Sequence, residues 1–157
     1  MDRTKDRRTQ KEAPGARRGD EARYRAIFDT AVDAIVVIDE VGLVGALNPA
    51  AERLFGYPSH EVIGRNVKML MAEPYGTAHD GYLARYRETG ERRIIGIGRA
   101  VTGQRRDGST FPLELSVAEW EAEGQRFFTG IMRDVTDRTR AQELQRLMVN
   151  ELNHRVK

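Results

Sequence analysis

Short β-branched runs alternate with short helical patterns along this chain, which predicts one small α+β domain. Strand-like runs occupy residues 34–39, 43–47, 93–104, 110–120 and 126–135. The pairs Asp107-Gly108 and Glu123-Gly124 stand between the last three runs and are typical of hairpin turns. The pattern therefore predicts a five-stranded antiparallel sheet with short helices on one face.

Helical patterns fill the middle of the domain, at residues 50–55, 58–64, 66–71 and 77–89. Asn48 is a favoured N-cap, and Pro49 fits the first turn of a helix, so the first of these helices should begin there. Gly56 is a natural stop for it. Ser59 is the expected cap of the second helix.

The two ends of the chain carry a different pattern. Residues 1–20 have almost no apolar side chains and are predicted to be a disordered basic leader. Residues 21–135 form the predicted domain, which a short amphipathic helix enters. Residues 136–157 form a final helix with an exposed apolar stripe, which needs a partner because such side chains avoid water. The stripe consists of Leu144, Leu147, Met148 and Leu152.

Composition narrows the possible functions. The net charge is only +2 over 157 residues, and the basic excess lies in the leader, with seven Lys and Arg against four Asp and Glu in the first twenty residues. A basic leader can contact nucleic acid or acidic membrane, but a solvated tail is the simpler interpretation. The chain has no cysteine, which excludes disulfides, thiolate catalysis and Cys-ligated metals. No apolar run reaches membrane-spanning length and no signal peptide is recognisable, so we expect a cytoplasmic location.

Four segments resemble the successive landmarks of a PAS domain over residues 23–134. They are residues 33–39, 48–57, 63–64 and 105–112. Four others resemble, more specifically, the haem-binding PAS domain of the FixL oxygen sensors: residues 66–71, 79–80, 82–86 and 94–99. The resemblance implies a PAS fold that binds haem b and senses oxygen or another diatomic gas.

His79 would be the ligand of the haem iron in this family. It shares a helical face with Leu83 and Tyr86, so its imidazole should emerge from an apolar wall, as five-coordinate haem requires. The alternative is a core or surface histidine that binds nothing.

Arg99 alternates with Ile95, Ile97 and Val101, so it lies on the apolar face of its strand, where a lone charge is costly. The resemblance implies that Arg99 alternates between a haem propionate and the bound gas. Alternatively, its side chain reaches the sheet edge, or it pairs with Glu114 or Glu119.

The resemblance assigns further contacts to the cofactor. Ile94, Leu115 and Val117 would form the apolar roof over the gas, although plain core packing explains such aliphatic residues as well. Arg85 and Arg93 would contact the propionates. Gly130 would leave space for the porphyrin.

The last residues, 151–157, resemble the phosphoacceptor box of HWE and related histidine kinases, with His154 as the acceptor. The alternative is an ordinary exposed helical histidine. The resemblance implies that the intact parent is a protein-histidine kinase that dimerises through this helix and transfers phosphate to a response regulator. This piece lacks the ATP-binding domain and could not phosphorylate itself.

Two other functions are compatible with these residues. The domain could be a cofactor-free PAS dimerisation module, in which His79 is idle. It could also bind flavin without a covalent bond, since the absence of cysteine excludes only the cysteine-dependent photosensors. A visible absorption spectrum distinguishes these possibilities from a haem sensor.

Overall fold

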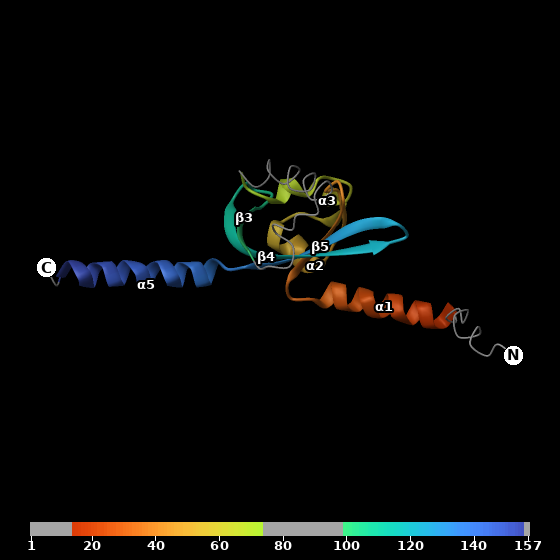
Figure 1. Ribbon diagram of the computed structural model, residues 1–157, viewed down its shortest axis with the longest axis horizontal. Helices are drawn as coiled ribbons and strands as arrows, with labels where there is room; N and C mark the ends of the chain where they lie inside the picture. The colour runs from red at the N-terminus through yellow and green to blue at the C-terminus, as the bar shows by residue number, and fades with distance from the viewer. Residues whose placement is uncertain (1–13, 74–98, 156–157) are drawn as a thin grey trace.

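The computed structural model describes residues 14–73 and 99–155, and it has the predicted architecture (Figure 1). A curved antiparallel sheet carries short helices on one face, and a long helix leaves each end of the domain. The elements, in chain order, are α1 (Pro14–Thr30), β1 (Ala34–Asp39), β2 (Val44–Leu47), α2 (Pro49–Phe55), α3 (Ser59–Val62), the 3-10 helix η1 (Val67–Leu70), β3 (Arg99–Gln104), β4 (Thr110–Ala122), β5 (Gln125–Asp134) and α5 (Thr136–Arg155).

The sheet has five strands in the order β2-β1-β5-β4-β3, and all neighbours are antiparallel. The last strand of the domain, β5, therefore lies between the first strand and β4. This arrangement confirms the predicted fold class. The helix expected at residues 77–89 and the first part of the strand expected at 93–104 lie outside the described residues.

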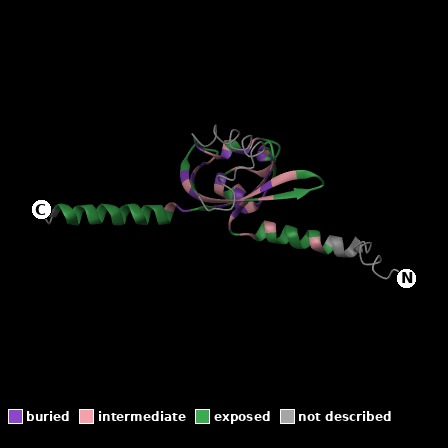
Figure 2. Cartoon of the chain, in the orientation of Figure 1, coloured by how far each residue is buried: buried purple, intermediate pink, exposed green. Residues whose placement is uncertain are grey.

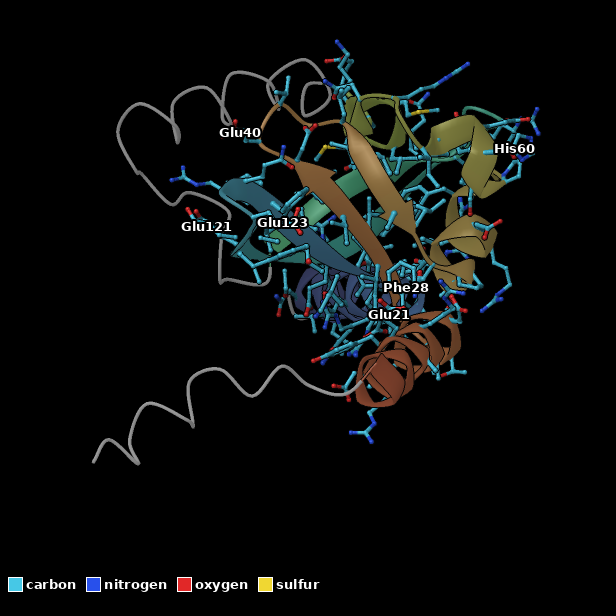
Figure 3. The ribbon with its side chains drawn as sticks, turned by 90° about the vertical axis from the view of Figure 1, so that its right-hand side faces the viewer. Glu21, Phe28, Glu40, His60, Glu121 and Glu123 are labelled. Carbon is cyan, nitrogen blue, oxygen red and sulfur yellow. The ribbon has the colours of Figure 1, made fainter. Side chains whose placement is uncertain are left out.

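β4 and β5 are the longest of the described strands, and the turn that joins them suits the twist of the sheet. Glu123 and Gly124 both have positive φ, 53° and 77°. Two such residues in succession match the right-handed twist of the strands on either side. The hairpin extends beyond β1, whose last residue, Asp39, pairs with Phe127, and its end carries Glu121 and Glu123 on the side of the domain opposite His60 (Figure 3).

Two helix starts differ from the predictions. Ser59 is not a cap: it is the first residue of α3, and Pro58, which offers no side-chain hydrogen bond, occupies the cap position. The Ser59 N–H instead donates to a Glu52 carboxylate oxygen at 3.3 Å. Helix α1 is already helical at Pro14, the first described residue, so residues 14–20 belong to a helix and not to the disordered leader that the sequence predicted. The prediction was wrong for these residues because Ala16, Arg17 and Arg18 are good helix formers, whatever the polarity of the segment.

A compact apolar core fills the space between the sheet and the layer formed by α2, α3 and η1. Every second residue of β1 is buried, as expected for a strand with one face inward. Phe55 of α2 lies 5.7 Å from Phe111 of β4, centroid to centroid, and ties the two layers together. The buried members are Ala34, Val36, Ile38, Val44, Leu47, Ala51, Phe55, Val62, Val67, Leu70, Val101, Phe111, Leu113, Phe128 and Met132.

Asn48 is a buried polar residue at the centre of this arrangement, with 0% exposure. Its Oδ1 accepts from the N–H of Ile35 at 2.8 Å and of Ala51 at 3.0 Å. Its Nδ2 donates to the carbonyls of Phe28 and Asp33, both at 3.1 Å. One amide thus joins the end of α1, the start of β1 and the first turn of α2, and Figure 3 shows Phe28 where α1 meets the domain.

We predict that Asn48→Ala lowers the free energy of unfolding by about 3 kcal/mol or more, because it leaves buried backbone groups without partners. Asn66→Ala is the matched control. Asn66 also caps a helix, through its bond to the Lys68 N–H, but it is partly exposed, so about 1 kcal/mol is expected. Urea unfolding of the three proteins measures both values; equal losses would contradict a linking role for Asn48.

Candidate ligand-binding face and output junction

Along β4, the residues on the inner face of the sheet become less buried toward the hairpin turn. Phe111 and Leu113 are fully buried in the core, whereas Leu115 and Val117, which point to the same face, are only partly buried and pack against the edge of that core. Their role in an apolar roof over a bound gas stays a prediction. Beyond the described helix layer, the sheet thus presents a partly covered aliphatic surface.

Gly130 lies on the same face of β5, between the buried Phe128 and Met132. It pairs with Val36 on one side and with Val117 on the other. A Cβ at this position would lie 3.4 Å from Leu115 Cδ1, at ordinary contact distance. The missing side chain therefore leaves room for about one methyl group beside Leu115.

A charged pair borders this aliphatic surface toward the hairpin end. Glu119 follows Val117 on the inward side of β4, and Arg126 precedes Phe128 on the inward side of β5. Arg126 Nε lies 2.8 Å from Glu119 Oε1, and the two side chains are 34% and 19% exposed. Apolar and ionic surfaces thus adjoin on one face.

Arg99 is the first residue of β3 and pairs opposite Leu115. It has the same strand parity as Val101, which is 6% exposed, so its backbone position belongs to the inner face. Its side chain lies outside the described part. The two carboxylates considered as its partners each hold another arginine: Glu114 binds Arg138 at 3.0 Å, and Glu119 binds Arg126.

The remaining predicted cofactor residues, His79, Arg85, Arg93 and Ile94, lie outside the described residues. Within residues 14–73 and 99–155, no group of His, Asp and Glu side chains could hold a metal ion. Over the same residues, no helix is long and apolar enough to cross a membrane.

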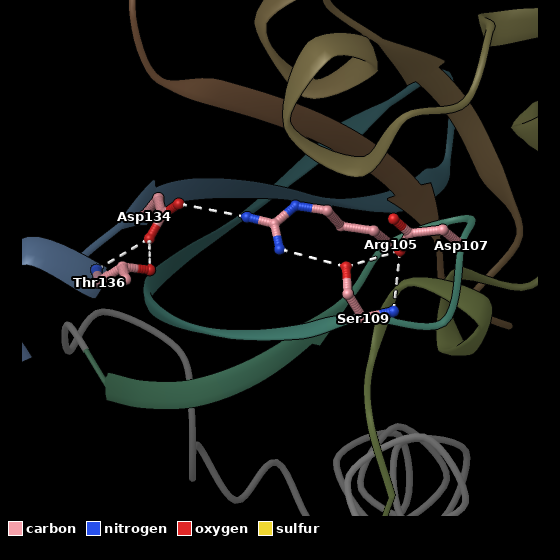
Figure 4. A network of polar contacts seen from close by, with 5 residues as sticks. All are labelled: Arg105, Asp107, Ser109, Asp134 and Thr136. Carbon is pink, nitrogen blue, oxygen red and sulfur yellow. Dashed lines mark hydrogen bonds and ion pairs between the residues drawn. The ribbon is translucent and has the colours of Figure 1, made fainter.

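A polar network joins the β3–β4 turn to the start of α5 (Figure 4). Arg105 lies 3.5 Å from an Asp134 carboxylate oxygen, and its guanidinium covers the Phe111 ring at 4.1 Å. The other Asp134 oxygen accepts from the N–H of Thr136 at 2.9 Å and from its hydroxyl. Asp134 thus links the first turn of α5 to the β3–β4 turn.

The turn side of this network is itself ordered by hydrogen bonds. Ser109 donates to Asp107 through its hydroxyl at 2.6 Å and its N–H at 2.8 Å, which holds the pKa of Asp107 below its ordinary value. Arg105 donates to the Ser109 hydroxyl at 3.4 Å. The turn therefore presents Arg105 to Asp134 in a fixed position.

Helix α5 carries an apolar stripe that nothing in the described chain covers (Figure 2). Leu144, Met148 and Leu152 are each 60% exposed, and Leu147 is 54% exposed. His154 lies near the end of the helix and is exposed. At about 100° per residue it falls beside Leu147, on the flank of the stripe.

The fold of this domain is that of a known family. The PAS-fold family model matches residues 22–135, and the chain belongs to the PAS family. The PAS domain of an HTR-like protein from Haloarcula marismortui superposes with a TM-score of 0.65 at 25% identity, covering 76% of this chain and 95% of that one.

Two sensor proteins are among its relatives. The chain is 46% identical over 145 residues to the sensor protein FixL of Bradyrhizobium diazoefficiens, which covers 92% of this chain and 29% of that protein. It is 33% identical over 119 residues to the oxygen sensor protein DosP of Escherichia coli, covering 76% of this chain and 15% of DosP. The similarity to FixL confirms the resemblance found in the sequence. The chain spans less than a third of either relative.

Sequence reasoning overlooked two features of this region. The contact of Arg105 with Asp134 joins residues far apart in the chain, and no local pattern marks it. The Arg126–Glu119 pair could have been found, because Arg126 has the same alternation as Phe128 and Glu119 the same as Val117.

Substitutions at two glycines test how tightly the inner face is packed around each of them. A Cβ at Gly103 would lie 2.6 Å from Leu113 and 2.7 Å from Phe111, so Gly103→Ala should lower the free energy of unfolding by about 1–3 kcal/mol through overpacking. Gly130→Ala meets nothing closer than 3.4 Å and should change it by less than about 1 kcal/mol. Urea titrations of both variants check the contrast, and a large loss in Gly130→Ala would show that the face has no such space.

Proposed function

We propose that this domain senses oxygen, or another diatomic gas, by holding haem b against the inner face of the sheet, with His79 as the iron ligand. The observation that carries the proposal is the half-buried aliphatic surface of Leu115 and Val117 on the inner face, next to Gly130, where no side chain projects. The 46% identity to FixL and the similarity to DosP, which is named an oxygen sensor, support the choice of ligand.

The residues of this face fit such a group. A porphyrin is flat and apolar and carries its carboxylates along one edge, and the face offers aliphatic surface next to a glycine, followed by a charged border. When bound, haem would supply the iron that takes up the gas. Leu115, Val117 and Ile94 would exclude water from it, and Arg85 and Arg93 would neutralise the propionates.

Arg99 would couple the gas to the sheet in this proposal. Its guanidinium would pair with a propionate in one state and donate a hydrogen bond to the gas in the other, since a charge on the apolar face requires a polar partner. Its position opposite Leu115 at the start of β3 supports this role.

The signal would leave through the β3–β4 turn. Strand β3 runs from Arg99 to Gln104 and leads directly into Arg105, which contacts Asp134 at the junction with α5. A displacement of β3 would therefore change the contact that orients the first turn of α5. The second contact, between Arg138 and Glu114 of β4, acts on the same turn.

Helix α5 would pass this change to a histidine kinase of a two-component system. Two copies would pair in parallel through the exposed stripe, and His154, on its flank, would accept phosphate from the ATP-binding domain of the intact kinase and donate it to a response regulator. A neutral imidazole is a competent nucleophile near pH 7. The similarity to a cell-division control histidine kinase, PdhS of Brucella ovis, at 32% identity over 119 residues supports this setting.

Haem binding is tested by the visible spectrum of the protein reconstituted with haemin. We expect a Soret band that is lost in His79→Ala, because the iron loses its axial ligand. His60→Ala is the matched control, since His60 is exposed on α3, on the side of the domain opposite the end of the β4–β5 hairpin (Figure 3), and its spectrum should equal that of the wild type. A His79→Ala spectrum with unchanged position and intensity would refute the proposed ligation, and a flavin spectrum would favour the alternative cofactor.

Pairing through α5 is tested by sedimentation equilibrium. Replacing Leu144 and Leu152 together by Gln should raise the dimer dissociation constant about a hundredfold or more, because each buried leucine contributes about 1.5–3 kcal/mol. Arg146→Gln is the control: Arg146 is also exposed, at 66%, but at about 100° per residue it lies on the opposite face of the helix from Leu144. Equal association of all three proteins would exclude the stripe as the contact.

A further inference from the structure

Four charged side chains connect α1 to α5, the two helices that leave the domain in opposite directions (Figure 1), across the outer face of the sheet. Glu114 of β4 and Arg133 of β5 pair across these strands. Both belong to the outer face, because the neighbouring Leu113 and Met132 are buried in the core on the inner face. Each of the two also binds a residue outside the sheet. We call the four residues the outer ladder; in spatial order they are Asp33, Arg133, Glu114 and Arg138.

One end of the outer ladder lies between α1 and β1. The Asp33 carboxylate accepts two hydrogen bonds from Arg133, from Nε at 3.2 Å and from Nη2 at 3.0 Å. Two parallel bonds of this kind fix both the distance and the orientation of the two groups. The backbone carbonyl of Asp33 is bound by Asn48, which also binds the Phe28 carbonyl in α1. The position of Asp33 therefore depends on where α1 ends.

The other end of the outer ladder lies in the first turn of α5. Arg138 belongs to the turn that begins at Thr136, and its Nη2 donates to a Glu114 carboxylate oxygen at 3.0 Å. This contact holds the turn to β4, whereas Asp134 links the same turn to Arg105. The outer ladder thus reaches α5 through residues that the Arg105 contact does not use.

The alternation of charge couples the two ends. Arg133 stands between two carboxylates, and Glu114 stands between two guanidinium groups. The pKa of Arg133 is raised, first by its hydrogen bond with Asp33 and also by the charge of Glu114. When Asp33 moves away or loses its charge, Arg133 turns toward Glu114 and competes with Arg138 for it. Single exposed ion pairs contribute little, but pairs that share members do not act independently.

We propose that the outer ladder is a second control of α5, through which a change at the end of α1 alters the first turn of α5 without any ligand on the inner face. It goes beyond the proposed haem function and does not depend on it. The coupling is reciprocal, so that a loosened first turn of α5 also loosens the end of α1.

Amide hydrogen exchange of the full chain, without porphyrin, tests this coupling. The Thr139 N–H binds the Val135 carbonyl at 2.9 Å and reports the first turn of α5. Asp33→Asn keeps the shape of the side chain and removes its charge, and it should speed the exchange of Thr139 about two- to fivefold, the effect of one exposed ion pair. In an Arg138→Gln background, where the outer ladder is already broken, Asp33→Asn should have no further effect.

The matched control is an Arg146→Gln background. Arg146 is also an arginine of α5, but it pairs with Glu143 on its own helix. Asp33→Asn should therefore keep its full effect on Thr139 in this background.

The end of α1 supplies the reciprocal measurement. The Ala31 N–H binds the Ile27 carbonyl at 3.1 Å, and Arg138→Gln should speed its exchange. The inference is wrong if Asp33→Asn acts equally in the wild-type and Arg138→Gln backgrounds, or if it leaves Thr139 unchanged. An equal change at the amides of the central strand β5 would also overturn it, because that result indicates a general loss of stability. None of these results bears on haem binding, and a chain that binds no porphyrin leaves this inference intact.

Discussion

The buried amide of Asn48 is the interaction on which the rest of this domain depends. Folding places it at 0% exposure, where an unsatisfied amide would be costly, and its four hydrogen bonds reach Phe28, Asp33, Ile35 and Ala51. These partners belong to α1, β1 and α2 and to the segment between α1 and β1. The amide therefore sets where the first helix ends and how α2 lies on the sheet. In the proposed function, the ligand lies on the other part of the inner face, around Gly130.

Separate parts of the sheet carry the two halves of the proposed mechanism. The ligand face lies along the hairpin side of β4 and β5, with Leu115, Val117, Gly130 and the Arg126–Glu119 border. The output junction lies at the other end of the same strands, where Arg105 contacts Asp134. Strand β3 begins at Arg99, opposite Leu115, and ends at Gln104, directly before Arg105. This one strand therefore connects the ligand face to the output junction, although the two do not contact each other.

Much of the fold could be predicted because local patterns are strong where each strand has one buried face. The β-branched run of Ala34–Asp39, the Asn48-Pro49 start of α2 and the Glu123-Gly124 turn each reflect local chemistry, and the structure agrees with all three. Boundaries were less predictable. The Ser59 cap was wrong, because the extended backbone of Pro58 takes the cap position and a Glu52 carboxylate from the preceding helix binds the Ser59 N–H.

The sequence by itself determined the class of the domain and the positions of its strands along the chain. It also determined that Leu115, Val117 and Gly130 face inward, because side chains alternate between the two faces of any strand. Only the tertiary structure decided which distant residues meet. Asn48 was recognisable as a helix cap, but its bonds to Phe28 and Asp33 require α1 to return to the sheet. The contacts of Arg105 with Asp134 and of Arg126 with Glu119 depend on strand pairing and register, which bring together residues that no local pattern connects.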